Sequence, residues 1–224
     1  MKAMLLAAGR GERMGELTQS LPKPLLEVGG ERLIERQLRL LARAGVTEIV
    51  INLSYRGAEI RELVGDLTPW GQRVVYSEEG EPPLETGGGI VAALPLLGQA
   101  PFIVVNADVY TNFDYSALLG ADTDNVLVLV PNPEHHPHGD FGLDRSGVVI
   151  RREPLLTYSG ISLLSPAIFA GIAPGHQRLR PILEAAIEQR ALAGLYFGGV
   201  WEDVGTPERL DAVRRLAAGL VPTG

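Results

Sequence analysis

The sequence predicts an α/β fold built on a doubly wound, mostly parallel sheet. Three observations support this prediction: short apolar segments alternate with amphipathic ones in the first half of the chain, the first apolar segment leads into a glycine-rich loop, and 46% of the 224 residues are hydrophobic. Such alternation is typical of parallel strands joined by right-handed helical crossovers. Ligands of these sheets bind beyond the carboxyl ends of the strands.

The composition excludes several classes of partner and chemistry. The formal net charge is −7, the isoelectric point is near 5.2, and no block of basic residues occurs. We therefore expect no binding to nucleic acid or to an anionic membrane surface. Cysteine is absent, which excludes disulfides and thiolate chemistry. The chain starts without the pattern of a secretory signal, and no apolar run reaches membrane-spanning length, so we expect a cytoplasmic protein.

The first strand and the loop after it form the first candidate site. Met1 to Ala8 is an apolar run typical of a buried strand. Gly9 and Gly11 follow at once, and glycines let backbone N–H groups approach a ligand closely. Arg13 and Lys23 add two cations to the same loop. Two cations favour a polyphosphate ligand over a single carboxylate.

Two common glycine motifs are excluded here. No Gly-x-x-x-x-Gly-Lys-Ser/Thr string occurs, so the loop is not a Walker A loop. A dinucleotide-binding fingerprint needs a third glycine where Met14 stands, and it needs an acidic residue where Leu53-Ser54 ends the second strand. A dinucleotide-dependent oxidoreductase is therefore rejected. On spacing alone, a phosphate-binding loop and an ordinary turn with solvated charges remain open.

The other elements of the first half follow from periodicity and breakers. A short strand or turn is expected at 26–30, an amphipathic helix at 31–44 ended by Gly45, strands at 47–53 and 74–76, and helices at 58–63 and 90–97. The segment 77–89, SEEGEPPLETGGG, holds two prolines and three consecutive glycines. It predicts a loop with special backbone geometry, either a flexible connector or part of a binding site.

A strand at Pro101–Asp108 carries the next candidate residues. It ends in Asn106-Ala107-Asp108, at the edge of the sheet where ligands are expected. A carboxylate beside a polyphosphate requires a cation between them, and Mg²⁺ is usually held by one or two carboxylates plus phosphate oxygens. Asp108 is therefore the first predicted Mg²⁺ ligand. Asp114, just before a helical stretch, is predicted to cap that helix.

The second half predicts further strands, helices and a covering hairpin. The expected elements are a turn at 122–125, a strand at 126–130, antiparallel hairpin structure at 141–160, a helix starting at Ser165-Pro166, a helix at 181–192, a strand at 195–200 and a helix at 208–218 capped by Thr206. Three histidines, His135, His136 and His138, do not predict a zinc site, because prolines interrupt the run and no cysteine is present.

The string LAAGRGERM…LT…PKPLLEVGG resembles the signature of the sugar-phosphate nucleotidyltransferases, a G-x-G-x-R-M loop followed by P-K-P. Length and later motifs resemble the short bacterial N-acetylmuramate-1-phosphate uridylyltransferases, with mannose-1-phosphate guanylyltransferases as close relatives. The resemblance covers nearly the whole chain. It implies one Rossmann-like domain, 1–224, of the nucleotide-diphospho-sugar transferase fold. Its nucleotide-binding half is 1–110, and its sugar-binding half, 111–224, contains the small antiparallel subregion. One departure is Gly15-Glu16, where many relatives carry Arg-Pro.

The resemblance also implies roles for individual residues. Arg13, Lys23, Asp108 and Asp203 are the implied catalytic residues, and Asp108 and Asp203, the latter in WEDVGTP, are the implied Mg²⁺ ligands. The implied nucleotide-binding residues are Ala8, Gly9, Gly11, Glu12, Arg13, Lys23, Glu85, Thr86 and Gly87. Sugar contacts are implied at Asn106, at Asp140 in the Gly-Asp-Phe string, and at Ser159, where the family usually has Asn. For Asp140, an ordinary turn is an equally good interpretation.

The expected reaction transfers a nucleotidyl group from UTP to a sugar 1-phosphate, with N-acetylmuramate 1-phosphate as the implied acceptor in cell-wall sugar recycling. A guanylyltransferase that uses GTP and mannose 1-phosphate remains an alternative. An alternative of another class is a non-catalytic module that binds nucleotide sugars. Both metal carboxylates and both loop cations are present, which favours an enzyme. The oligomeric state cannot be predicted from the sequence.

Overall fold

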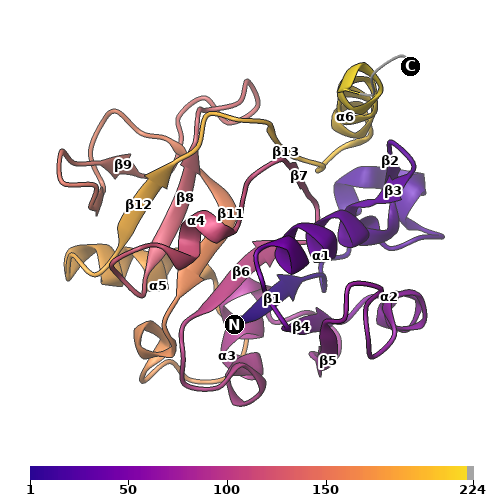
Figure 1. The fold of residues 1–224 in the computed structure, drawn as a ribbon, viewed down its shortest axis with the longest axis horizontal. Helices are drawn as coiled ribbons and strands as arrows, with labels where there is room; N and C mark the ends of the chain where they lie inside the picture. The colour runs from indigo at the N-terminus through magenta and orange to yellow at the C-terminus, as the bar shows by residue number, and fades with distance from the viewer. Residues whose placement is uncertain (221–224) are drawn as a thin grey trace.

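The computed structural model describes residues 1–220. Within these residues seven strands form the central sheet, and Figure 1 shows it running through the molecule. In order across the sheet they are β12 (Ala193–Tyr196), β8 (Val126–Val130), β11 (Thr157–Leu164), β6 (Phe102–Asn106), β1 (Lys2–Leu6), β4 (Glu48–Leu53) and β5 (Arg73–Glu78). β11 is antiparallel to both neighbours, and the other six strands are parallel to one another. The predicted mostly parallel sheet is confirmed.

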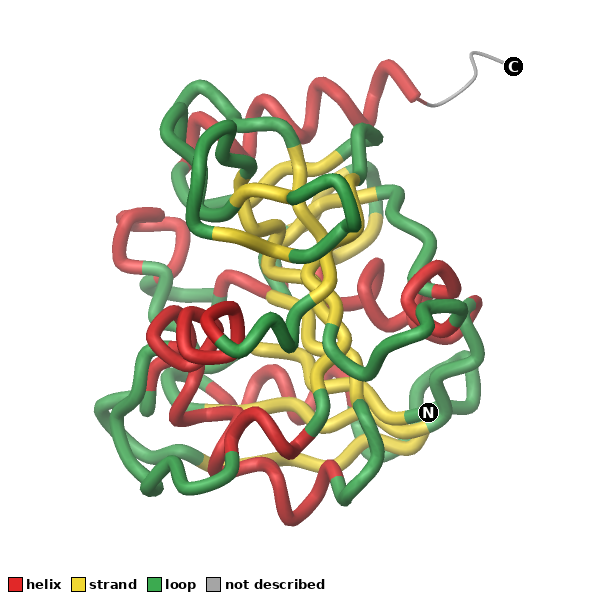
Figure 2. Tube along the Cα trace, turned by 90° about the vertical axis from the view of Figure 1, so that its left-hand side faces the viewer, coloured by secondary structure: helices red, strands yellow, loops and turns green. Residues whose placement is uncertain are grey.

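Helices cover both faces of the sheet, as Figure 2 shows. One face packs against α1 (Leu33–Arg43), α2 (Gly57–Val64) and α4 (Ser116–Leu119), and the other against α3 (Glu85–Leu97) and α5 (Leu179–Glu188). The alternation of side chains along a strand produces the two layers. In β1, Ala3 and Leu5 belong to the first apolar cluster and Met4 to the second. The fold is therefore doubly wound, as expected.

A third apolar cluster lies beside the sheet and joins the two ends of the chain. It packs the last helix, α6 (Pro207–Leu220), against the turns that follow β1. Those turns are η1 (Glu12–Thr18), η2 (Lys23–Leu25) and the ladder of β2 (Glu27–Val28) with β3 (Glu31–Arg32). Met14 is buried between them with 1% of its surface exposed. The residue that breaks the dinucleotide fingerprint is thus the apolar anchor of the loop.

Two short ladders complete the strands. β7 (Val109–Thr111) pairs with β13 (Trp201–Asp203), and β9 (Gly142–Leu143) pairs with β10 (Val149–Ile150), both antiparallel. The expected hairpin at 141–160 is thus confirmed only for its first part, because Thr157 onward belongs to β11 in the central sheet. The start at Ser165-Pro166 is the short 3₁₀ helix η3 (Pro166–Phe169), with the Ala167 N–H donating to Ser165 Oγ.

The predicted loop at 77–89 is wrong at both ends. β5 extends to Glu78, and α3 already begins at Glu85, so the three glycines are helical. The physical reason is close packing. A Cβ on Gly87 would lie 2.9 Å from the backbone of Arg178, and one on Gly88 would lie 2.1 Å from the Gly175 carbonyl oxygen. The glycines therefore give another segment room to approach the first turn of α3.

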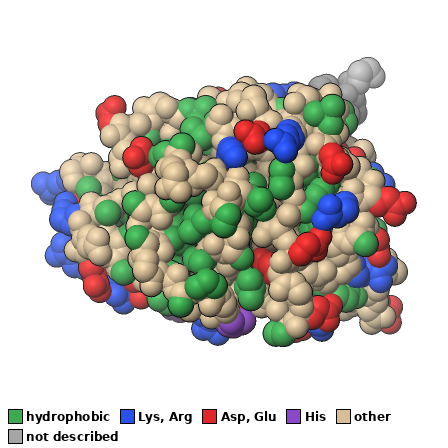
Figure 3. All heavy atoms as spheres, turned by 90° about the horizontal axis from the view of Figure 1, so that it is seen from below, with side chains coloured by type: hydrophobic (Ala, Val, Ile, Leu, Met, Phe, Trp, Pro, Cys, Tyr) green, Lys and Arg blue, Asp and Glu red, His purple; other side chains and the backbone are tan. Residues whose placement is uncertain are grey.

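The surface is mixed in character. Figure 3 shows one face, on which hydrophobic side chains gather in the middle while acidic and basic side chains lie mainly toward the ends. Among residues 1–220, no helix combines the length and the hydropathy needed to cross a lipid bilayer.

A buried hydrogen-bond chain ties α1 to the strand beyond β6, and we expect its loss to destabilise the fold. Gln37 is fully buried, donates from Nε2 to the Val109 carbonyl, and accepts from the Tyr115 hydroxyl. Gln37→Leu leaves both partners buried and unpaired, at a cost of about 2–4 kcal/mol of unfolding free energy. Chemical denaturation measures this loss. Adding Tyr115→Phe removes the unpaired hydroxyl, so the double variant should lose less unfolding free energy than the two single variants lose together. Additive losses would show that Gln37 and Tyr115 are not coupled.

Candidate functional site

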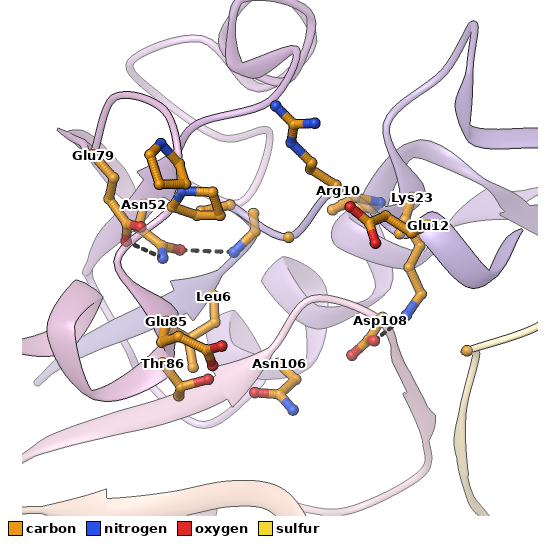
Figure 4. A pocket seen from close by; sticks show the side chains of 18 of the residues that line it. Leu6, Arg10, Glu12, Lys23, Asn52, Glu79, Glu85, Thr86, Asn106 and Asp108 are labelled. Atoms are coloured by element: carbon orange, nitrogen blue, oxygen red, sulfur yellow. Dashed lines mark hydrogen bonds and ion pairs between the residues drawn. The ribbon is translucent and has the colours of Figure 1, made fainter. Parts of the chain in front are cut away.

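A cleft of about 860 Å³ opens at the carboxyl ends of β1, β4 and β6 (Figure 4). Its position is the one expected for ligands of a parallel sheet. Of the residues predicted for the site, the cleft wall contains Ala8, Gly9, Gly11, Glu12, Arg13, Lys23, Glu85, Thr86, Asn106 and Asp108. The structure therefore gathers the glycine loop, the start of α3 and the end of β6 around one space. Gly87, Asp140, Ser159 and Asp203 lie outside this wall.

The glycine loop has a defined fold. Gly11 has φ 66°, and its carbonyl accepts hydrogen bonds from the Met14 N–H at 2.8 Å and the Thr18 hydroxyl at 3.0 Å. Gly15 interrupts η1 with φ 58° and ψ −129°, a conformation that requires glycine. This requirement explains why glycine stands at the position where the sequence departs from the family signature.

An ion pair between Lys23 and Asp108 crosses one end of the cleft. Figure 4 shows the Lys23 ammonium pointing at the Asp108 carboxylate. Both side chains are largely buried, with 11% and 27% of their surfaces exposed. Lys23 comes from η2 and Asp108 from the turn between β6 and β7, so the fold brings these two predicted residues together.

Asp203 reaches the same end of the cleft through the β7–β13 ladder. It lies opposite Val109, and the Val204 N–H donates to the Asp108 carbonyl at 2.9 Å. Asp108, in the turn before β7, and Asp203, in β13, therefore lie close together in the backbone. The Asp203 carboxylate pairs with the Arg209 guanidinium and lies 2.9 Å from His135 Nε2. Burial raises the pKa of Glu202, and the negative charge of Asp203 adds to the shift.

Sequence reasoning missed Arg209 and Gly205 at this end. A Cβ on Gly205 would lie 1.9 Å from Arg209 Nη2 and 3.4 Å from Arg13 Nη2, so the two guanidinium groups converge over this glycine. Gly205 also lines the cleft. The sequence signal that could have identified Arg209 was its place three residues after the predicted helix cap Thr206. Arg209 stands in the first turn of α6, where its backbone N–H donates to the Thr206 hydroxyl at 3.4 Å.

Two further missed residues, Asn52 and Glu79, fix the opposite end. Asn52 accepts from the Ala7 N–H at 2.7 Å and donates to Glu79 Oε1 at 2.6 Å, and Glu79 Oε2 accepts from the Leu84 N–H at 2.8 Å. Figure 4 shows this chain of hydrogen bonds on the side away from Asp108. A Cβ on Gly89 would lie 2.3 Å from Glu79 Oε1. The signal in the sequence was a lone polar residue near the end of an apolar strand.

A second pocket of about 290 Å³ adjoins the cleft. The two share Glu85, Thr86 and Asn106, and Asp140 and Tyr158 lie only on the second wall. Asp140 accepts from the Tyr158 N–H at 2.9 Å and from Arg180 at 3.0 Å. Burial raises the pKa of Tyr158 to about 12, so its hydroxyl stays neutral.

Ser159 and Gly87 line neither pocket, and both have packing or hydrogen-bonding roles within the fold. Ser159 is buried in β11, where its hydroxyl donates to the Val128 carbonyl at 2.7 Å. The next residue, Gly160, is the one that meets the site: a Cβ there would lie 2.5 Å from Asn106 Nδ2. The motif around Ser159 therefore leaves room for the Asn106 side chain.

Comparison with known proteins agrees with this arrangement. Residues 2–150 match the model of the family described as nucleotidyl transferase. An N-acetylmuramate alpha-1-phosphate uridylyltransferase of Neisseria meningitidis is 44% identical over 97% of this chain and 98% of its own length. A mannose-1-phosphate guanyltransferase of Schizosaccharomyces pombe is 30% identical over 93% of this chain, which spans 62% of that relative.

The fold comparison gives the same result at lower identity. A Bacillus anthracis crystal structure, described as that of a candidate glucose-1-phosphate thymidylyltransferase, superposes with a TM-score of 0.87. It is 18% identical, and the match covers 100% of this chain and 97% of that one. With a family match across more than half of its length and a full-length relative at 44% identity, this chain belongs to the nucleotidyl transferase family of enzymes.

Proposed function

We propose that this protein transfers a uridylyl group from UTP to N-acetylmuramate 1-phosphate, with the release of pyrophosphate. The observation that carries the proposal is the convergence of a glycine loop, three cations and two carboxylates at one end of a cleft. The full-length match to a uridylyltransferase supports the choice of substrates. We also propose the expected place in cell-wall sugar recycling and in the cytoplasm.

The reaction needs no protein nucleophile. An oxygen of the sugar 1-phosphate forms a bond to the α-phosphorus of the nucleotide, while the bond from that phosphorus to the β-phosphate oxygen breaks and pyrophosphate leaves. Catalysis is then positioning plus neutralisation of charge. The backbone at Gly9 and Gly11 binds the triphosphate, Arg13 offsets the charge of the leaving pyrophosphate, and Lys23 binds phosphate oxygens at the reacting centre.

The residues present fit a divalent cation. Asp108 and Asp203 would supply hard oxygen ligands from the two sides of the β7–β13 ladder, and in this structure Lys23 pairs with Asp108 and Arg209 with Asp203. No group of three or more metal-ligating side chains occurs in the part of the chain described, so the remaining ligands must come from phosphate oxygens and water, as Mg²⁺ prefers. Mg²⁺ bound there supplies charge neutralisation between the two phosphate groups.

The far end of the cleft is proposed to bind the base. Glu85 and Thr86 line it, and the hydrogen-bond chain from Ala7 through Asn52 and Glu79 holds the neighbouring backbone in place. Each Glu79 carboxylate oxygen accepts one hydrogen bond from the protein, which holds this side chain in place at the base-binding end. The choice of uracil is supported by the full-length relative that is described as a uridylyltransferase.

Pyrophosphate release tests the substrate assignment. UTP with N-acetylmuramate 1-phosphate should give the highest kcat/KM, and GTP with mannose 1-phosphate should be at least about tenfold slower, because the relative that matches over its full length at 44% identity is described as a uridylyltransferase for that sugar. Faster turnover with GTP and mannose 1-phosphate would instead identify a guanylyltransferase. Absence of turnover with every pair, alongside retained binding of nucleotide sugars in calorimetry, would identify a non-catalytic binding module.

Asp108→Asn should lower kcat by about 10²–10³-fold with the fold intact, because a neutral amide is a weak ligand for Mg²⁺ and leaves the phosphate charges uncompensated. Steady-state kinetics and circular dichroism measure the two effects. Asp114→Asn is the matched control, since Asp114 is exposed and accepts only from the Ser116 N–H in the next turn. Full turnover of the Asp108 variant would reject the metal assignment.

Removal of divalent cations gives an independent check. Treatment with EDTA should abolish pyrophosphate release, and added Mg²⁺ should restore it, because the two aspartates and the phosphates repel one another without a cation. Ca²⁺, which is larger and binds with less strict geometry, should restore binding better than turnover. Undiminished activity in EDTA would show that Lys23 and Arg13 alone neutralise the phosphates.

A further inference from the structure

Two arginines line the second pocket, and only one of them is paired with carboxylates. The Arg180 guanidinium is neutralised by Asp140 and by Glu184, each at 3.0 Å. Arg178 lines the same pocket, and within residues 1–220 it forms no ion pair. Of the carboxylates on the pocket wall, Asp140 binds Arg180 and the Tyr158 N–H, whereas Glu85 has only the exposed His176 nearby, at 3.8 Å. Arg178 is an exposed residue of the pocket wall, and no carboxylate within residues 1–220 pairs with its charge.

The backbone of Arg178 is held firmly against α3. The Gly88 N–H donates to the Gln177 carbonyl at 2.9 Å, and the Gln177 N–H donates to the Leu84 carbonyl at 3.0 Å. A Cβ on Gly87 would lie 2.9 Å from the Arg178 carbonyl carbon. The glycines of α3 therefore let this segment approach, and they place Arg178 on the pocket wall beside Thr86.

The charge on Arg178 is not needed for the phosphates. Lys23, Arg13 and Arg209 lie at the Asp108 end of the cleft, whereas the second pocket adjoins the cleft through Glu85, Thr86 and Asn106. A sugar whose phosphate sits near Asp108 extends past Asn106 toward the second pocket. An arginine guanidinium with a free fork of donors matches a carboxylate, which accepts two parallel hydrogen bonds.

We propose that Arg178 binds a carboxylate carried by the sugar and so selects an acidic sugar 1-phosphate over its neutral counterpart. The inference rests on the proposed function and adds a specificity-determining residue to it. N-acetylmuramate fits the requirement, because it is N-acetylglucosamine with an O-linked lactic acid group. N-acetylglucosamine 1-phosphate is therefore the matched substrate that lacks only that acid.

Arg178→Gln tests the assignment when both sugars are compared. For N-acetylmuramate 1-phosphate, kcat/KM should fall about tenfold or more, mainly through a higher KM, because the variant loses a charged contact made in both ground and transition states. For N-acetylglucosamine 1-phosphate it should change less than about threefold. Arg178→Lys should recover part of the loss. Arg145→Gln, an exposed arginine in the turn between β9 and β10, is the control and should change neither substrate.

Calorimetry with each sugar 1-phosphate, without nucleotide, separates this inference from the proposed function. Tighter binding of the acidic sugar that disappears in Arg178→Gln supports the inference even if UTP is not the donor. Equal losses for both sugars would assign Arg178 to the phosphate or to the fold and overturn the proposal. The role of Arg178 would also be overturned if the wild-type protein turned over both sugars equally or bound neither. Equal turnover of both sugars would still leave the proposed nucleotidyl transfer intact.

Discussion

The pairing of β7 with β13 is the constraint on which the site depends. Asp108 and Asp203 lie far apart in the chain, and the three residue pairs of this ladder bring Asp203 beside the turn that holds Asp108. The last helix then continues from β13 onto the apolar cluster around Met14, so α6 and the turns that follow the first strand form one packed unit. Antiparallel pairing fixes register, because a shift of one residue would turn Asp203 to the opposite face.

Electrostatics explains how an acidic chain can prepare a site for anions. The net charge is −7, yet the ligand-facing cations are concentrated at one end of one cleft. Lys23 is largely buried there, and a buried ammonium without a partner is costly. Asp108 provides the partner for Lys23, and Asp203 provides it for Arg209. The two carboxylates thus stabilise the two cations.

Local features of the sequence predicted much of this arrangement. The strand at 2–6, the glycine loop and the acid beyond β6 were found because strands, breakers and carboxyl ends leave local patterns. Asn52 and Glu79 were missed because the fold brings Asn52 of β4 beside Glu79, which directly follows β5. Arg209 was missed because its approach to Arg13 over Gly205 also arises only in the fold. The sequence predicts a loop at the three consecutive glycines 87–89, because glycine is found both in flexible loops and where two segments pack closely. The close approach of the 175–178 segment to Gly87 and Gly88 shows that close packing is the reason here.

The first turn of α3 forms a partition between two chambers, with Glu85 and Thr86 exposed to both. Its glycines leave no space to remodel it from within. A substitution at Glu85 or Thr86 that reshaped the smaller chamber would therefore alter the larger one at the same time. Independent change of the smaller chamber is left to the opposite wall, where Leu179, Arg180 and Leu183 of α5 line only that chamber.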